Sequence, residues 1–282
     1  MEIELSHLPV TEEKVTCRGL SRILNGLHAY VYGRWTRGYV GLLRNQILPR
    51  LSSQGKKKLA DGFHCKVLTP EHAKAIITIN RDISKRDLEQ IIPYPTARTL
   101  VLKGSSDVVV YECACRHTRK HSCQPTQVCM MIGKSVGDFI LRYHPARSRR
   151  ISQAEALDLL EAEYTRGHVH TAWFKDAIGG RFYAICNCCK CCCFGIEAMY
   201  TYGTPMVAPS GYVAWVDEMS CNACGACKTS CPFGAIEMNG IASVKWDKCM
   251  GCGVCTSQCS SSVMALVRDE RKGIPLDVRA LI

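Results

Sequence analysis

The sequence predicts an α+β fold in which short helices and β-hairpins carry runs of cysteine. Three observations lead to this prediction. Helix-capping patterns precede apolar stretches, apolar segments are joined in pairs by turn residues, and 20 of the 282 residues are cysteine. A chain of this length forms about two or three domains. A hydrophobic share of 47% with 22% charged residues is typical of globular proteins.

The first 14 residues contain acidic side chains where a signal peptide requires positive charge, and they include no apolar core segment. No apolar stretch of the sequence is long enough to span a bilayer. We therefore expect a cytoplasmic protein, with a peripheral position at the inner membrane face as an alternative. In a reducing compartment, numerous thiols indicate metal ligands or redox groups rather than disulfides.

Within the first expected domain, residues 1–65, one segment accounts for almost all of the net charge of +11. Residues 14–58 contain ten basic side chains and no acidic one: Lys14, Arg18, Arg22, Arg34, Arg37, Arg44, Arg50, Lys56, Lys57 and Lys58. Apolar residues recur here at helical spacing, at Leu20, Ile23, Leu24, Leu27 and Val31. The segment is either a surface for an acidic protein or a membrane, or a helix packed on the core with solvated arginines. No nucleic-acid-binding motif accompanies the charge, so a nucleic-acid partner is not expected.

The second expected domain, residues 66–204, begins with capping signals. Thr69-Pro70 predicts the start of a helix that continues to about Asn80. The pattern at residues 84–87 predicts a second short helix, ended by Pro93. Apolar residues 99–102 and 108–111 flank turn residues 103–107 and predict a β-hairpin that leads into Cys113. Residues 128–142 are expected to be helical.

The same order of elements follows once more along the chain. Ser152 and Glu155 form a capping box, and the helix they open is expected to stop at Gly167. Residues 169–174 and 181–186 flank a Gly-Gly turn and predict a second hairpin, which leads into Cys186. Each hairpin is thus expected to deliver a Cys-x-Cys pair at a strand end. Prolines 205 and 209 mark the linker to the third expected domain, residues 205–282.

The third domain contains two C-x2-C-x2-C-x3-C runs. This spacing is typical of [4Fe–4S] binding, because short spacers wrap three thiolates around one cluster while the fourth cysteine binds the other cluster. The expected ligands of one cluster are Cys221, Cys224, Cys227 and Cys259, and those of the other are Cys249, Cys252, Cys255 and Cys231. Zinc is the alternative metal, but it favours two separated pairs of ligands over runs of four.

Residues 213–267 resemble a bacterial two-cluster ferredoxin domain, including the Pro-Phe-Gly-Ala-Ile sequence that follows the first run. The family usually has proline where this chain has Ser260, a departure that removes no ligand. The resemblance implies low-potential, one-electron transfer with a redox partner protein.

Ten further cysteines lie in the central domain: Cys113, Cys115, Cys123, Cys129, Cys186, Cys188, Cys189, Cys191, Cys192 and Cys193. Thiols at this density would oxidise or crosslink without a ligand, so they indicate a bound metal. One or two additional [4Fe–4S] clusters are therefore expected. A Cys/His zinc site that uses His117 and His121 is one alternative, and redox-active thiols are another. The composite pattern resembles a family of larger ferredoxin-fused iron–sulfur proteins. Cys17 and Cys65 are isolated and are expected to be ordinary buried thiols.

We therefore expect an iron–sulfur electron-transfer protein that relays electrons to a partner oxidoreductase, with no residue required to be catalytic. Two alternatives stay open. An iron–sulfur reductase would bind substrate at a central cluster fed by the ferredoxin domain. A zinc-stabilised interaction module would use the central cysteines to shape a docking surface.

Overall fold

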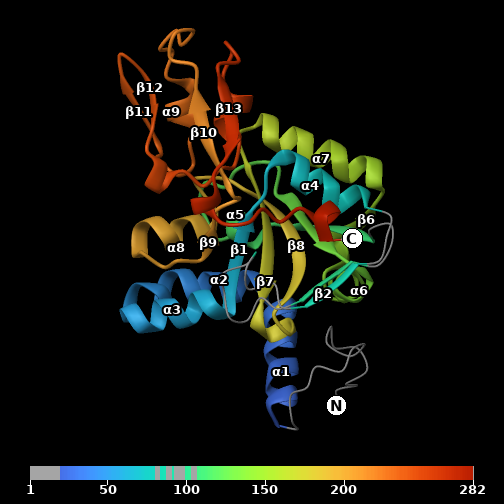
Figure 1. Cartoon of the computed structure of the whole chain (residues 1–282). Helices are drawn as coiled ribbons and strands as arrows, with labels where there is room; N and C mark the ends of the chain where they lie inside the picture. Colours follow the sequence, from blue (N-terminus) through green and yellow to red (C-terminus); the bar gives the residue numbers. More distant parts are fainter. Residues whose placement is uncertain (1–19, 80–82, 87–90, 92–98, 103–106, 282) are drawn as a thin grey trace.

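A nine-stranded mixed sheet organises most of the chain (Figure 1). The computed structural model describes residues 20–79, 83–86, 91, 99–102 and 107–281. The sheet has the strand order β6-β4-β5-β8-β7-β1-β9, and β2 and β3 extend it from β8. Its strands are β1 (Phe63–Val67), β2 (Ile83–Arg86), β3 (Thr99–Leu102), β4 (Val108–Glu112), β5 (Gln127–Ile132), β6 (Ser148–Ile151), β7 (Val169–Lys175), β8 (Arg181–Cys188) and β9 (Val207–Ala208).

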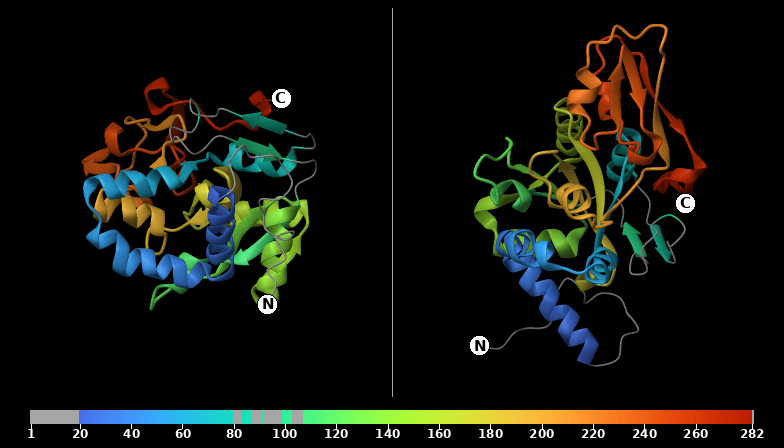
Figure 2. Two further views of the ribbon diagram at one scale, coloured as in Figure 1. Left: turned by 90° about the horizontal axis from the view of Figure 1, so that it is seen from below. Right: turned by 90° about the vertical axis from the view of Figure 1, so that its left-hand side faces the viewer.

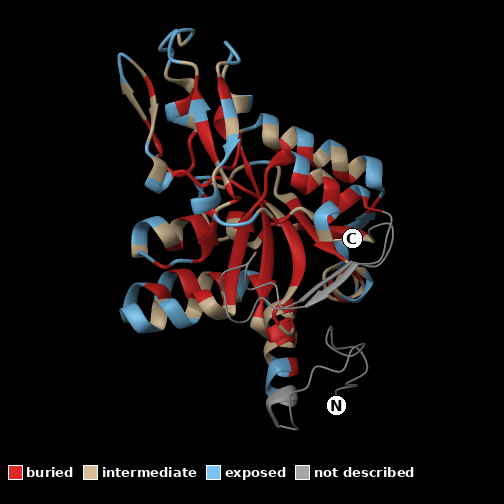
Figure 3. Cartoon of the chain, viewed as in Figure 1, coloured by how far each residue is buried: buried red, intermediate tan, exposed pale blue. Residues whose placement is uncertain are grey.

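Helices cover both faces of this sheet. They are α1 (Leu20–Arg34), α2 (Thr36–Leu42), α3 (Ser53–Gly62), α4 (Pro70–Thr78), α5 (Ala114–His117), α6 (Lys134–Tyr143), α7 (Gln153–Thr165) and α8 (Phe194–Tyr202). Helices α4 and α7 pack together over one face, while α1, α2 and α6 lie over the other (Figures 1 and 2). Because both faces are covered, every residue of β1 and of β7 is buried (Figure 3).

Local capping signals fix the ends of two of these helices. The Thr69 hydroxyl accepts a hydrogen bond from the His72 N–H at 3.3 Å, and α4 begins at Pro70 as predicted. The Ser152 hydroxyl accepts from the Glu155 N–H at 3.2 Å, which opens α7 as predicted. The chain leaves α7 through Gly167, whose φ of +79° only glycine adopts without strain.

Two helix predictions in the central domain are wrong. Residues 83–86 form β2 instead of the start of a helix, because they pair with β3, and pairing overrides a weak capping pattern. Asp87 and Pro93 lie outside the described residues. Residues 127–132 form β5 instead of a helix, since this unbroken apolar run lies between β4 and β8. Only the second half of the expected helix is helical, as α6.

The expected first hairpin is also wrong, although both of its strands exist. Strand β3 pairs with β2 and β8, whereas β4 pairs with β5 and β6. The second pair of strands, β7 and β8, does pair antiparallel across the Gly179-Gly180 turn. Partner choice in the first case depends on strands that lie far away in the sequence, and a local turn signal does not encode it.

The C-terminal part forms two small sheets above the main one (Figure 2). Strand β10 (Tyr212–Val216) pairs with β13 (Met264–Arg268), and β11 (Ile236–Asn239) pairs with β12 (Ile241–Val244). Two short helices, α9 (Ala226–Ser230) and α10 (Val254–Ser257), follow cysteine-rich loops. Buried Lys66 of β1 donates to the Pro209 carbonyl at 2.8 Å and so ties the linker to the main sheet.

Helix α1 projects from the body of the molecule (Figure 1). Its apolar residues Leu24, Leu27 and Val31 are exposed, and so is Trp35, which follows the helix. Arg44, in contrast, is buried and therefore does not belong to a solvated basic surface. Among the described residues, no helix is long and apolar enough to cross a membrane.

Candidate metal centres

The strand order brings the central cysteines together at one end of the sheet. Strands β4, β5 and β8 are neighbours, and Cys129 of β5 is the register partner of Cys186 on β8. Cys186 and Cys188 are two residues apart on one strand, so their side chains share one face of the sheet. Cys113 follows β4 directly and is the N-cap residue of the short helix α5. Cysteines that are far apart in sequence thereby meet.

Six of these cysteines form what we call the buried thiol set: Cys113, Cys115, Cys129, Cys186, Cys188 and Cys193. All six line one cavity of about 90 Å³, and so does Cys189. Hydrogen bonds with Cys115 and Cys129 raise the pKa of Cys113, and burial adds to the effect. Hydrogen bonds with Cys115 and Cys188 raise the pKa of Cys193 in the same way. The thiols therefore form a continuous chain of contacts around the cavity.

The opposite wall of the cavity is apolar and aromatic. It is formed by α1, α2 and α6, which contribute Tyr32, Val40, Phe139 and Ile140 among others. The hydroxyls of Tyr32 and Tyr183 lie 2.8 Å apart and satisfy each other. Burial raises the pKa of Tyr32 well above its ordinary value, so this phenol is neutral. Thiols thus line one side of the cavity, and the opposite side has few groups that could form hydrogen bonds with water.

The remaining four central cysteines form the surface thiol set: Cys123, Cys189, Cys191 and Cys192. Their sulfur atoms all lie within 4.8 Å of one another, and the Cys123 and Cys191 sulfurs are 2.8 Å apart. Cys191 is exposed, whereas Cys189 and Cys192 are buried. Four converging thiols are a suitable ligand set for zinc or for an iron–sulfur cluster.

Histidine is absent from this group of possible ligands within the described chain. His117 instead lies 2.9 Å from the Glu112 carboxylate and forms an ion pair with it when protonated. The structure therefore gives no support to a mixed Cys/His site built on His117. Cys65 is buried in β1, as expected, and Cys17 lies outside the described residues.

Two buried arginines lie where the two thiol sets meet. The Arg44 guanidinium donates to the carbonyl oxygens of Cys115, at 3.2 Å, and of Cys192. Its Nε lies 2.7 Å from the Glu197 carboxylate, which also binds Arg119 at 2.8 Å. With two arginines on one carboxylate, this network carries net positive charge beside the thiols.

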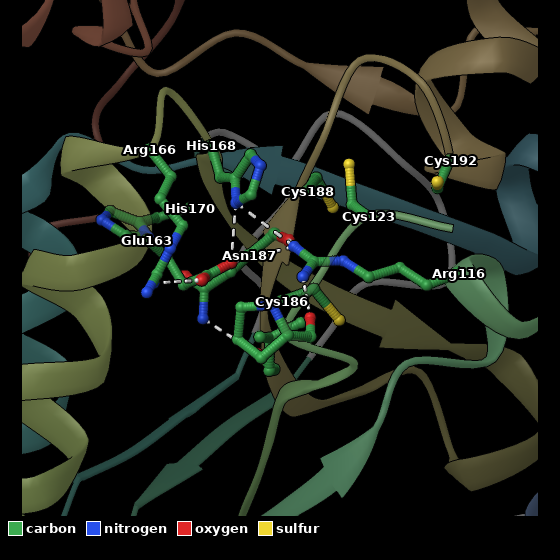
Figure 4. Close-up of polar contacts among 12 residues, drawn as sticks. Arg116, Cys123, Glu163, Arg166, His168, His170, Cys186, Asn187, Cys188 and Cys192 are labelled. Carbon is green, nitrogen blue, oxygen red and sulfur yellow. Dashed lines mark hydrogen bonds and ion pairs between the residues drawn. The ribbon is translucent and has the colours of Figure 1, made fainter. Parts of the chain in front are cut away.

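Arg116 forms the second network, which Figure 4 shows in close-up. Its guanidinium donates to Glu163 at 2.9 Å and to the Asn187 carbonyl at 3.2 Å. Glu163 also binds Arg166 at 2.8 Å and His168 at 2.7 Å. The pKa of Arg116 is raised by its contact with Glu163 and by the nearby thiols Cys189 and Cys113, against the opposing effect of burial. Arg116 is thus a permanent cation that acts on both thiol sets.

Sequence reasoning missed Arg44, Glu163 and Glu197. Nothing distinguishes Arg44 from the nine other basic residues around it. Glu163 did carry a signal, because it lies three residues after buried Leu160 on the apolar face of α7. A carboxylate at such a position predicts a buried cationic partner.

In the C-terminal part, four cysteines line a cavity of about 20 Å³: Cys231, Cys249, Cys252 and Cys255. Cys231 belongs to the first run and the other three to the second. The Ala214 N–H donates to the Cys249 sulfur and the Ala235 N–H donates to the Cys231 sulfur, both at 3.3 Å. Backbone donors to ligand sulfurs are typical of iron–sulfur sites.

The backbone of the second run is shaped for close approach. Gly251 has a φ of +65°, and a Cβ there would collide with the Tyr212 carbonyl and the Ser210 hydroxyl. This glycine lets the loop between Cys249 and Cys252 fold against β10. The four cysteine ligands, the N–H groups that donate to their sulfurs and this compact loop are together suited to a four-iron cluster.

The other expected ligands are Cys221, Cys224, Cys227 and Cys259. Cys227 is buried, Cys221 and Cys259 are half-buried, and Cys224 is exposed. Burial raises the pKa of Cys227, and the charges of Cys259 and Cys224 raise it further. Ser260 is exposed.

Helix α8 connects the central thiols with the C-terminal ones. It begins directly after Cys193. Near its other end, Tyr200 donates to the Phe233 carbonyl, and burial and the charges of Cys231, Cys252 and Cys249 raise its pKa. On the other side, the Tyr164 hydroxyl of α7 donates to the Gly253 carbonyl at 3.0 Å. Helices α7 and α8 of the central part therefore contact the cysteine-rich loops of the C-terminal part.

In a comparison with known protein families, residues 214–237 match the 4Fe-4S binding domain family. The matched segment runs from β10 to β11 and includes the first run, Cys221 to Cys231. The chain therefore carries a ferredoxin-type 4Fe–4S binding segment. The comparison does not extend the resemblance to the central cysteines, and no curated protein matches the chain.

Proposed function

We propose that this chain is an iron–sulfur electron-transfer protein that exchanges electrons with a redox partner protein. Two ferredoxin-type [4Fe–4S] clusters and one or two further clusters at the central thiols would be its cofactors. The observation that carries the proposal is the cavity in which Cys231 of the first run joins Cys249, Cys252 and Cys255 of the second. Iron–sulfur clusters, when bound, supply one-electron transfer.

The chain's own residues keep the two groups of thiols close. Cys193 and Tyr200 are separated by seven residues of helix α8, a rise of about 10 Å. Cys193 belongs to the buried thiol set, and Tyr200 lies beside Cys231. This short separation supports electron exchange between central and C-terminal sites within one chain.

Arg44 and Arg116 would tune the central sites. Both are buried, and both place positive charge beside thiols. Buried positive charge stabilises the more negative, reduced state of a neighbouring redox group, so it raises the reduction potential. The structure thus supports central sites that accept electrons from low-potential ferredoxin-type sites.

The test is a potentiometric titration of the anaerobically purified chain, followed by electron paramagnetic resonance. Reversible one-electron signals from ferredoxin-type clusters at low potential, and from a further species at higher potential, would support the proposal. A protein that contains only zinc and takes up no electrons would overturn it in favour of an interaction module. A central signal that changes with an added substrate would indicate a reductase instead.

A further inference from the structure

We propose that the buried thiol set binds a single iron–sulfur cluster larger than a four-iron cubane, separate from any metal bound by the surface thiol set. This inference rests on the proposed iron–sulfur function and specifies the kind of cluster at one of its sites.

The number of thiols is the first argument. Each iron of a [4Fe–4S] cluster takes one protein thiolate, so a cubane uses four cysteines, and structural zinc also uses four ligands. Seven cysteines line this cavity: the six of the buried thiol set and Cys189, which also belongs to the surface thiol set. A cubane or a zinc ion bound by the buried thiol set would leave two of its six cysteines unused. If every thiolate binds an iron, the cluster needs more irons than a cubane contains.

The size of the cavity is the second argument. It measures about 90 Å³, whereas the cavity lined by four cysteines in the C-terminal part measures about 20 Å³. The larger cavity is therefore also the one that more thiols line. A space of this size would hold several waters, but its wall of Tyr32, Val40, Phe139 and Ile140 offers them few partners.

Charge is the third argument. Clusters ligated by many thiolates are strongly anionic and require compensation when they are buried. Arg44 contacts the backbone of Cys115, and Arg116 interacts with Cys113. Each of these arginines shares its carboxylate, Glu197 or Glu163, with a second arginine. Each of these two networks therefore carries net positive charge beside the six thiols, and Glu112, which also lines the cavity, pairs with His117 and Arg147.

The surface thiol set provides a separate site. Its four sulfurs converge on one another within 4.8 Å, and one of its cysteines is exposed. The buried thiol set instead surrounds a cavity beneath α1, α2 and α6, whose lining also includes Cys189 of the surface thiol set. Arg44 lies at the boundary, since it donates to a carbonyl of each set. Substitutions in one set, Cys189 excepted, are expected to leave the metal of the other in place.

The experiment measures iron and acid-labile sulfide in the full chain, purified anaerobically, for six variants that each change one cysteine of the buried thiol set to alanine. Cys65→Ala is the matched control, because Cys65 is buried but does not line the cavity. Cys191→Ala reports on the surface thiol set. All six variants are expected to lose the same amount of iron, more than four atoms per chain, while Cys65→Ala loses none.

A loss of four irons or fewer, or an effect at only four of the six positions, would overturn the inference in favour of a cubane. Mössbauer spectroscopy of the unmodified, ⁵⁷Fe-enriched chain decides the question even if a variant does not fold. It should show a component with more than four irons in addition to the ferredoxin-type components. If the ferredoxin-type components are present and the larger one is missing, this inference alone fails. If both are missing, the proposed function fails as well.

Discussion

Arg116 and Glu163 form an ion pair in which both side chains are completely buried, with 2.9 Å between the guanidinium Nη2 and the carboxylate Oε2. The pair joins α5, which carries Cys115, to α7, which packs on the face of the sheet opposite to α1, α2 and α6. It therefore anchors the cysteine loop that follows β4. Breaking such a pair is costly, because the remaining charge stays buried without a partner.

The first prediction concerns this pair. Glu163→Gln leaves the Arg116 guanidinium uncompensated and should lower the free energy of unfolding by about 3–5 kcal/mol. Glu161→Gln is the control on the same helix, since Glu161 pairs with Lys74 in solvent. That change should cost less than about 1 kcal/mol. Denaturant titrations of both variants measure the difference, and equal losses would contradict the buried role of Glu163.

The second prediction concerns the ligands in the C-terminal part. Cys231→Ala should remove the cluster associated with Cys249, Cys252 and Cys255, because these thiols line one cavity. About four irons should be lost, and one ferredoxin-type resonance signal should disappear. Ser230→Ala is the neighbouring control, since its hydroxyl bonds only within α9.

Cys221→Ala should remove the other ferredoxin-type signal. If Cys221→Ala and Cys231→Ala abolish the same signal and spare the same one, the crossed assignment of ligands is wrong.

The third prediction is a pH dependence caused by Lys66. Burial, with a smaller effect from Arg268, lowers the pKa of Lys66 to about 7. The unfolded chain keeps this proton up to a pKa of about 10.4, so between these values the unfolded state binds more protons. Stability should therefore rise with pH, by roughly 2 kcal/mol between pH 7 and pH 9.

Lys66→Met removes the titrating group and should flatten this rise. Thermal unfolding at both pH values measures it, with Lys74→Met, an exposed lysine on α4, as the control. A wild-type rise that persists unchanged in Lys66→Met would show that another group causes it.

The fourth prediction concerns the basic and apolar surface around α1. Leu24, Leu27 and Trp35 are exposed beside Arg34 and Arg37, a combination typical of helices that bind anionic membranes. We propose this surface as a peripheral membrane contact. Reversing the charge at Arg34 and Arg37 should weaken binding to vesicles of anionic lipid by about tenfold or more.

Arg279→Glu, an exposed position at the other end of the chain, is the matched control for this charge change. Binding should also fall as salt is raised. Vesicle binding that is independent of salt and unaffected by the Arg34 and Arg37 changes would rule out this contact.

Local signals in the sequence account for part of the fold. The capping box at Ser152 predicts α7 because its hydrogen bond forms between near neighbours. The sequence predicts a helix where β5 lies, because a short apolar run in a buried strand has no periodicity of its own. The hairpin between β3 and β4 failed for a related reason. Strand β3 pairs with β2 and β8, and β4 pairs with β5 and β6, and these pairings depend on the assembled sheet.

The sequence likewise predicts one part of the candidate sites and not the other. Motif spacing identifies the eight C-terminal cysteines, because consecutive ligands bind within one loop. The division of the ten central cysteines into two sets follows from the strand order and from the turn at Cys189–Cys193, which spacing does not specify. Arg44 and Arg116 acquire their roles only when α2, α5 and α7 converge on the sheet. A single sequence gives little information on which helices pack together in this way.

The most direct test of the central claim is the number of iron and acid-labile sulfide atoms per chain in anaerobically purified protein. Two ferredoxin-type clusters alone account for about eight irons. We predict more than eight, with sulfide in comparable amount, because the central thiols are proposed to bind iron as well. A count of about eight irons or fewer, with zinc or no metal at the central cysteines, would contradict it.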